Sequence, residues 1–245
     1  MPATPAWPPK SLPRLFVRTP LVTGAAVELD AKQANYLGNV MRLGAGEHVL
    51  LFDGASGEWI ARIAEAGRKR MTLAVEDRTR EPEAVPDLWL AFAPVKRAQT
   101  DWLIEKATEL GVARLLPVVT QRTIVERVKL ERLEAIAIEA AEQCNRTSVP
   151  TIDNPQPLAA FLKAHSERTI YFADEAGGEP AAAAFKSGAA TILTGPEGGF
   201  TDEERAAIRA STNAVPISLG PRILRAETAA LVAVTAYMAL AGDWR

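Results

Sequence analysis

The sequence of 245 residues contains one cysteine and two histidines, and this scarcity limits its chemistry. With Cys144 as the only cysteine, an intrachain disulfide is excluded and a reducing compartment is favoured. His48 and His165 lie far apart in the sequence, so the ligands of a zinc site are lacking. The long uncharged run 229–242 is too short to cross a bilayer and is typical of a core helix. These features predict a cytoplasmic protein that uses no metal and no membrane.

Charge is distributed unevenly along the chain. Residues 1–80 hold eleven Lys or Arg against eight Asp or Glu, a net charge of +3, whereas residues 81–245 hold seventeen against twenty-two, a net charge of −5. A mildly basic first part suits the phosphate backbone of a nucleic acid, although a solvated surface explains it about as well. The Pro-rich stretch 1–11 predicts a disordered leader, and 81–87 predicts a linker.

The hydrophobic pattern differs on the two sides of that linker. Short β-like runs at 15–17, 48–52, 59–63 and 71–75, with one helical stretch at 31–41 capped by Asp30, predict a small barrel or sandwich over 12–80. From residue 88 onward, strand-like runs at 88–93, 114–119, 169–172, 190–194 and 215–219 alternate with helical segments. This alternation predicts a mainly parallel sheet covered by helices on both faces, with ligands bound at the carboxyl ends of its strands.

A Gly-Pro loop, GPEGGFTDEE at 195–204, follows the fourth of these strands. Its glycines allow a ligand to approach the main chain, and Pro196 stiffens the turn. Thr201 and Glu204 have the spacing of a capping box, which predicts a helix from about Asp202. Three carboxylates in the first helical turn argue against a phosphate-binding loop.

A second Gly-Pro loop lies within SLGPRILRAETAA at 218–230. It places Arg222, Arg225 and Glu227 where a long apolar helix begins. Burial of charged side chains at the start of a buried helix costs free energy unless they form ion pairs or serve a function. A structural salt bridge between Arg225 and Glu227 is one interpretation, and a functional role for these charges is the other.

These two loops resemble the two signature segments of the RsmE family, methyltransferases of the SPOUT superfamily that methylate N3 of a uridine in 16S ribosomal RNA. Other segments similar to that family are LPRLFV (12–17), YLGNVMRLGAGE (36–47), LLFDG (50–54), 93–112, 121–126 and 141–150. The resemblance implies a PUA-like RNA-binding domain at 12–80 and a SPOUT catalytic domain at 88–245. It also implies S-adenosylmethionine as the cofactor, a homodimer and a deep trefoil knot, which the sequence pattern alone would not predict.

The resemblance places the cofactor in the two Gly-Pro loops. The residues expected to bind it are Leu193, Thr194, Gly195, Pro196, Glu197, Gly198, Gly199, Leu219, Gly220, Ile223, Leu224, Arg225 and Thr228. N3 of uridine must lose a proton during methylation, so we expect Arg225 to stabilise the resulting anion and Glu197 or Glu227 to accept the proton or orient the base. The basic residues expected to contact RNA are Arg14, Lys32, Arg42, Lys96, Arg122 and Arg146.

The expected partner is small-subunit ribosomal RNA or the assembled small subunit. One alternative is a SPOUT methyltransferase that acts on another RNA, and the PUA-like first half, which is similar to one family in particular, argues against it. Another is a non-catalytic RNA-binding or ribosome-assembly factor. The intact set Gly195, Glu197, Arg225 and Glu227 argues against that alternative.

Overall fold

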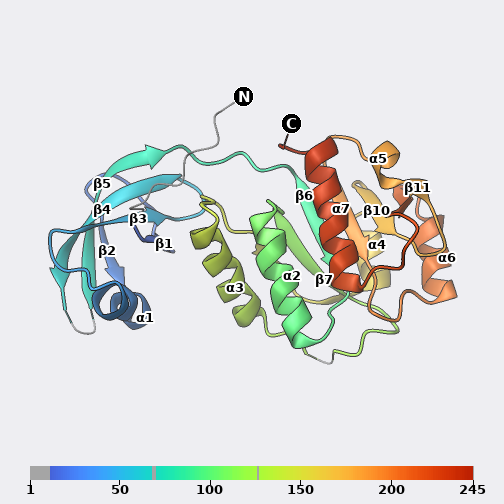
Figure 1. Cartoon of the computed structure of the whole chain (residues 1–245), viewed down its shortest axis with the longest axis horizontal. Helices are drawn as coiled ribbons and strands as arrows, with labels where there is room; N and C mark the ends of the chain where they lie inside the picture. Colours follow the sequence, from blue (N-terminus) through green and yellow to red (C-terminus); the bar gives the residue numbers. More distant parts are fainter. Residues whose placement is uncertain (1–11, 68–69, 126, 245) are drawn as a thin grey trace. The chain divides into compact units, whose positions relative to one another are not determined.

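The computed structural model describes residues 12–67, 70–125 and 127–244, which form two compact units (Figure 1). The first unit contains the described residues up to Glu83 together with Glu142–Ser148, and the second contains Ala84–Ala141 and the rest from Val149 onward. The leader expected at 1–11 lies outside the described residues. The return of 142–148 to the first unit was not predicted, because it depends on contacts between residues far apart in the sequence.

The first unit is built on a five-stranded sheet of order β1-β3-β4-β5-β2, in which β1 and β3 are parallel and the other neighbours antiparallel. Its elements are β1 (Arg14–Phe16), β2 (Ala26–Leu29), α1 (Ala31–Asn35), the π-helical turn η1 (Tyr36–Val40), β3 (His48–Phe52), β4 (Glu58–Ala66) and β5 (Met71–Arg80). Asp30 caps α1 as expected by accepting from the amide of Gln33. Strand β2 was missed because only Val27 and Leu29 point inward.

The second unit contains an eight-stranded sheet in which every described strand pair is parallel, as predicted. The strand order is β11-β13-β10-β12-β6-β7-β8, and β9 also pairs with β7. The strands are β6 (Leu88–Phe92), β7 (Arg114–Val119), β8 (Thr151–Ile152), β9 (Gln156–Pro157), β10 (Thr169–Ala173), β11 (Glu179–Pro180), β12 (Ala190–Thr194) and β13 (Ala214–Ser218). The helices are α2 (Arg97–Glu109), α3 (Leu130–Gln143), α4 (Leu158–Ala164), α5 (Ala181–Ala184), α6 (Asp202–Ala210) and α7 (Ala226–Leu240).

Successive side chains of the central strands enter two different cores, as a period of two requires. Ile192 packs in the core that contains residues of α2, α3, α5 and α7, and its neighbour Leu193 packs with α4 and α6. Tyr171 and Phe172 of β10 divide in the same way. Figure 1 shows α2 and α7 side by side on the face of the sheet toward the viewer. The second unit is therefore a three-layer α/β structure. Among the described residues, no helix is long and apolar enough to span a bilayer.

Aromatic and charged side chains gather at the amino edge of this sheet. The guanidinium carbons of Arg168 and Arg114 lie 3.7 and 4.5 Å from the ring centroid of Trp89, and the ring of His165 meets Trp89 edge-on at 5.4 Å. Burial lowers the pKa of His165, and Arg114 and Arg168 lower it further, against the opposing charge of Asp153. The lowered pKa therefore favours the neutral form of the imidazole beside two cations.

We expect this histidine to make the fold sensitive to acid. Below its ordinary pKa of 6.5, the unfolded chain takes up a proton that folded His165 resists, so the free energy of unfolding falls as pH falls through this range. Replacing His165 with Phe removes the difference in proton uptake. Thermal unfolding should be measured from about pH 5 to about pH 8, a range that brackets the ordinary pKa of histidine. On acidification, Tm should fall less for His165→Phe than for the wild type. His48→Phe is the control, and an equal effect of both variants would contradict the prediction.

Candidate functional site

A cavity of about 400 Å³ opens at the carboxyl edge of the second sheet, where β10, β12 and β13 end. Because the strands are parallel, the three loops that leave them meet at this edge. Their lining residues are Ala173–Gly177 after β10, Thr194–Glu197 with Gly199 and Phe200 after β12, and Ile217–Leu224 at the end of β13, together with Arg205, Ala226 and Ala229 from the helices. The parallel sheet predicted a site at this edge, and the cavity lies there.

The loop after β12 folds tightly because Gly199 has a positive φ, which other residues rarely adopt, and because Gly195 packs closely against Phe200. Gly199 has φ +69°, and a Cβ on it would lie 2.7 Å from Oε1 of Glu175. A Cβ on Gly195 would come within 3.1 Å of the ring of Phe200, which is buried. The amide of Gly199 donates to the carbonyl of Pro196 at 2.9 Å and closes the turn. The main chain of this loop therefore forms part of the cavity wall.

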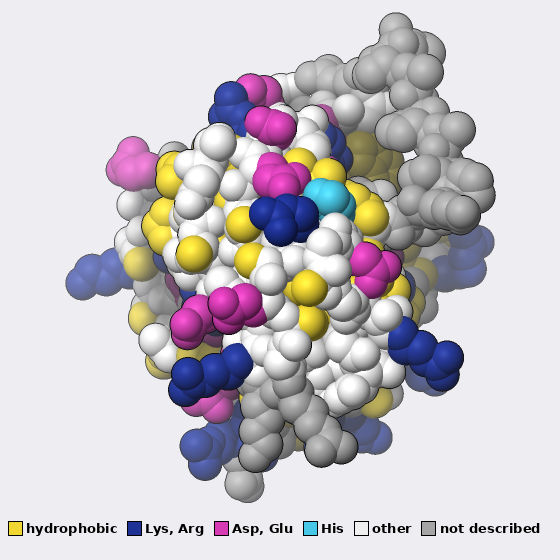
Figure 2. Space-filling view, turned by 90° about the vertical axis from the view of Figure 1, so that its left-hand side faces the viewer, with side chains coloured by type: hydrophobic (Ala, Val, Ile, Leu, Met, Phe, Trp, Pro, Cys, Tyr) yellow, Lys and Arg dark blue, Asp and Glu magenta, His cyan; other side chains and the backbone are white. Residues whose placement is uncertain are grey.

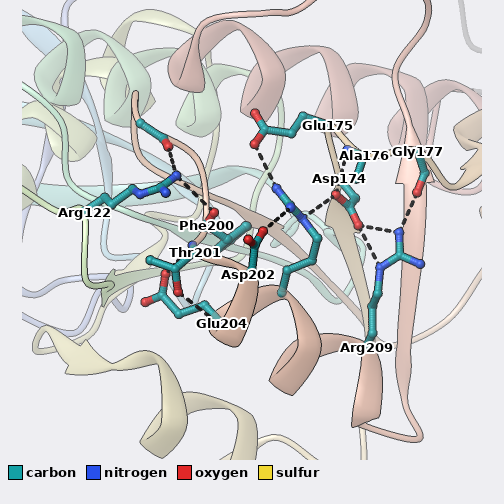
Figure 3. Close-up of polar contacts among 12 residues, drawn as sticks. Arg122, Asp174, Glu175, Ala176, Gly177, Phe200, Thr201, Asp202, Glu204 and Arg209 are labelled. Carbon is teal, nitrogen blue, oxygen red and sulfur yellow. Dashed lines mark hydrogen bonds and ion pairs between the residues drawn. The ribbon is translucent and has the colours of Figure 1, made fainter.

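The predicted capping box at the start of α6 is present and makes a further contact. Glu204 accepts from the amide of Thr201 at 3.0 Å, while the Thr201 hydroxyl accepts from the amide of Glu204 at 3.2 Å. The other carboxylate oxygen of Glu204 accepts from the amide of Gln121 at 2.7 Å, and Arg122 donates to the carbonyls of Gly198 and Phe200 (Figure 3). Glu204 is 8% exposed, so these amides depend on it. The loop after β7 thus holds the loop after β12 in place.

Replacing Glu204 with Ala should destabilise the second unit and loosen the cavity wall. The change leaves the amides of Gln121 and Thr201 without their acceptor, which we expect to cost about 1.5–3 kcal/mol of unfolding free energy. Urea unfolding followed by circular dichroism measures the loss. Glu203→Ala, which removes an exposed carboxylate from the same helical turn, is the control. Equal midpoints for the two variants would show that the Glu204 contacts carry no stability.

Nine of the residues expected to bind the cofactor line the cavity: Thr194, Gly195, Pro196, Glu197, Gly199, Leu219, Gly220, Ile223 and Leu224. Four do not. Leu193 is buried among the residues of the core, Gly198 is exposed and bonded to Arg122 through its carbonyl, and Arg225 and Thr228 lie at the start of α7 without lining the cavity. The loop 173–177 was not predicted as part of the site. Its available signal was a strand followed by Asp174, Glu175 and two glycines.

The three residues expected to act in catalysis have different environments. Glu197 is exposed and lines the cavity. Arg225 is exposed at the N-cap of α7, and no ion pair joins it to Glu227 within the described part of the chain, so the structural salt bridge is not observed. Glu227 is 8% exposed, and its Oε2 has no hydrogen-bond partner among the described atoms. This burial favours an orienting role for Glu227 over the role of proton acceptor.

Two of the six residues expected to contact RNA are buried instead. The side chain of Arg14 is bonded to Glu58 and to the carbonyls of Glu142 and Arg146, and Arg146 is paired with Glu83. Lys32, Arg42, Lys96 and Arg122 are exposed. Figure 2 shows one face of the molecule, on which basic side chains are scattered, one near the centre beside a histidine and others toward the rim, with acidic ones among them. The charge on that face is mixed rather than gathered in one basic patch.

Comparison with known proteins gives the class of the protein. A model of the RNA methyltransferase domain matches residues 81–238, and a model of the RNA methyltransferase PUA domain matches residues 29–76. The chain is therefore an RNA methyltransferase with an N-terminal PUA-like domain. The first match contains all three loops around the cavity. Among the described residues, no cluster of His, Cys, Asp or Glu could hold a metal ion.

Individual relatives give the family. The ribosomal RNA small subunit methyltransferase E of Rickettsia conorii is 31% identical, and the alignment covers 90% of this chain and 93% of the relative. The enzyme of the same name from Synechocystis is 32% identical, and the alignment covers 93% of this chain and 77% of the relative. The chain belongs to this ribosomal RNA small subunit methyltransferase E family. The crystal structure of the Neisseria gonorrhoeae enzyme of the same name, bound to S-adenosylmethionine, has a TM-score of 0.88 at 28% identity and covers 96% of this chain and 100% of its own.

Proposed function

We propose that this protein transfers the methyl group of S-adenosylmethionine to N3 of a uridine in small-subunit ribosomal RNA. The observation that carries the proposal is the cavity formed by three loops at the carboxyl edge of β10, β12 and β13. Support comes from the family and from the Neisseria gonorrhoeae structure, which has S-adenosylmethionine bound. We further propose that the protein acts in the cytoplasm and carries the trefoil knot of its superfamily.

The residues around the cavity fit this cofactor. S-Adenosylmethionine carries a sulfonium, an ammonium and a carboxylate group and no phosphate, so its net charge is positive, and carboxylates with an apolar wall suit it better than a cluster of basic residues. Glu175 and Glu197 supply carboxylates, and Leu219, Ile223 and Leu224 supply apolar surface. The acidic first turn of α6, which disfavours a phosphate, is compatible with a cationic ligand. Main-chain groups of the Gly-containing loops are available for the adenine.

The exposed charges beside the cavity suit N-methylation of uridine. When bound, S-adenosylmethionine would supply an electrophilic methyl group, and S-adenosylhomocysteine would leave as the carbon–sulfur bond breaks. For N3 to form a bond to that carbon it must lose its proton, and the negative charge then spreads onto O2 and O4. Glu197 is exposed and can take the proton, and the unpaired guanidinium of Arg225 can stabilise the charge on a carbonyl oxygen. We assign these two residues direct roles and Glu227 an orienting role.

Nucleoside mass spectrometry tests the whole proposal. Small ribosomal subunits from cells that lack this methylation are incubated with the purified protein and labelled S-adenosylmethionine, and the RNA is digested to nucleosides. We expect labelled N3-methyluridine. Label in transfer RNA or in large-subunit RNA alone would overturn the substrate and favour a methyltransferase with another RNA target. Absence of label from every RNA would favour a binding or assembly factor. Parallel reactions with naked RNA identify which form of the substrate is used.

Within each unit, exposed basic residues are the proposed contacts with RNA. Lys32 and Arg42 serve this role in the first unit, and Lys96 and Arg122 in the second. Arg42 has φ +59°, a left-handed conformation that is uncommon for a residue other than glycine and is often found at functional sites. Arg14 and Arg146 leave the proposed set because their side chains are buried and bonded inside the first unit.

We also propose that the protein is a homodimer in which α2 and α7 of each subunit take part. These two helices pack against each other, and each carries a large apolar side chain in solvent, Trp102 at 44% and Val232 at 39% exposure. Light scattering should give twice the chain mass of 26.4 kDa. Trp102→Glu combined with Val232→Glu should give monomers, whereas Val22→Glu in the first unit should not. A wild-type monomer would contradict the proposal.

A further inference from the structure

The loop that follows β10 forms a wall of the cavity with a fixed shape. Oδ1 of Asp174 accepts from the amide of Ala176 at 2.9 Å, and the carbonyl of Asp174 accepts from the amide of Gly177 at 3.1 Å. Gly177 has φ +102°, which a residue with a side chain rarely adopts. The backbone turn and the side chain of Asp174 therefore define the position of the next residue, Glu175.

Two arginines of α6, Arg205 and Arg209, anchor this loop. The side chain of Asp174 is 1% exposed and is paired with Arg209 at 2.6 Å and with Arg205 at 3.1 Å, and Arg209 also donates to the carbonyl of Gly177 at 2.8 Å (Figure 3). A buried carboxylate needs such partners because desolvation disfavours its charge. The loop is consequently fixed to α6, the helix that begins at the end of the loop after β12.

Glu175 is placed by the same arrangement. Nη2 of Arg205 donates to its Oε1 at 2.8 Å, and the carboxylate stands over Gly199, so that a Cβ there would lie 2.7 Å from Oε1 and 3.1 Å from Oε2. The Glu175 side chain is 49% exposed and lines the cavity. Its orientation is therefore set by the protein, while half of its surface is available to a ligand.

The ion pair with Arg205 distinguishes Glu175 from Glu197, the other exposed carboxylate that lines the cavity. Arg205 already compensates the charge of Glu175, so a second cation placed there would meet a guanidinium group 2.8 Å from Oε1. A neutral pair of hydroxyl groups suits such an acceptor better, since it donates hydrogen bonds without adding charge. Glu197, by contrast, has no ion-pair partner in the described structure. A carboxylate that accepts from ribose hydroxyls is a recurrent mode of nucleoside recognition.

We propose that Glu175 binds the ribose hydroxyls of the cofactor and that Arg205 is the positioning residue that holds Glu175 for this contact. The inference rests on the proposed use of S-adenosylmethionine and specifies which part of that molecule meets the loop after β10. It assigns a role to a loop that the two Gly-Pro segments did not reveal. The carboxylate stands over Gly199, so a side chain at that position would have to displace it.

Calorimetric titration with S-adenosylhomocysteine and its 2′-deoxy and 3′-deoxy analogues tests this assignment without requiring turnover. In the wild type, removal of a hydroxyl that Glu175 accepts from should weaken binding roughly 10- to 100-fold. In Glu175→Ala the parent compound should bind with a similar loss, and the missing hydroxyl should then cost no more than about threefold. Glu175→Gln, which keeps an acceptor oxygen, should fall between them. Glu203→Gln, which removes an exposed carboxylate that does not line the cavity, should behave as wild type.

Three results would overturn the assignment in distinguishable ways. Equal hydroxyl effects in the wild type and in Glu175→Ala would show that the ribose lies elsewhere, while the proposed cofactor would stand. If removal of the amino group, rather than of a hydroxyl, weakens binding in the wild type but not in Glu175→Ala, Glu175 pairs with the ammonium. Failure of the wild type to bind S-adenosylhomocysteine at all would reject the cofactor, and the assignment would fall with it.

Discussion

Arg14→Ala is expected to produce a large loss of stability. Its side chain is 6% exposed, and its Nε lies 2.6 Å from Oε2 of Glu58, which is 8% exposed. It also donates to the carbonyls of Glu142 at 2.9 Å and Arg146 at 2.7 Å. Removing one partner of a buried ion pair costs about 3–5 kcal/mol when the remaining charge is left without compensation. Because Arg80 also pairs with Glu58, at 3.2 Å from its Oε1, we expect the lower end of that range, about 3 kcal/mol, in the free energy of unfolding, measured by chemical denaturation.

The same substitution should release the segment 142–148 from the first unit. The two carbonyls that Arg14 binds lie in that segment, so amide hydrogen exchange there should accelerate more than in β3. Arg62→Ala is the matched control, because Arg62 is 45% exposed and pairs with Glu76 at the surface, where such a pair contributes about 1 kcal/mol or less. Arg14 was expected to bind RNA, and weaker RNA binding by Arg14→Ala without any loss of stability would favour that role over the structural one.

Local signals predicted the parts of the site that depend on local chemistry. The capping box of Thr201 and Glu204 follows from residues three apart, and it is present with both hydrogen bonds. The end of α2 also has a local cause, since Gly111 follows the C-cap with φ +91°, a conformation that glycine adopts readily. The parallel sheet followed from alternating strands and helices, and the site followed from the rule that ligands bind at the carboxyl edge.

Contacts between distant segments could not be predicted in this way. The loop after β10 faces the cavity only because β10 lies between β12 and β13, an order that the sequence does not specify. The burial of Arg14 and Arg146 depends on a segment near residue 145 that packs into the first unit. In the sequence both arginines look like available cations. A basic residue therefore predicts a nucleic-acid contact only when its neighbours in space leave it exposed.

Arg225→Ala should abolish most of the turnover while leaving the fold and the cofactor affinity intact. The residue is exposed, has no ion-pair partner within the described structure and does not line the cavity. If its guanidinium stabilises the uridine anion, its loss should lower kcat about 10²- to 10³-fold, as removal of a preorganised electrostatic contact does elsewhere. Single-turnover methylation measures the rate, and titration with S-adenosylhomocysteine measures the cofactor affinity.

Comparison with two further variants separates charge from geometry. Arg225→Lys keeps the positive charge and loses the fork of donors, so it should recover part of the rate if one carbonyl oxygen is the target. Lys163→Ala, which removes an exposed cation from α4, should leave the rate unchanged. Full turnover in Arg225→Ala would transfer the electrostatic role to another residue. A loss of cofactor binding without a change in kcat would instead make Arg225 part of the cofactor site.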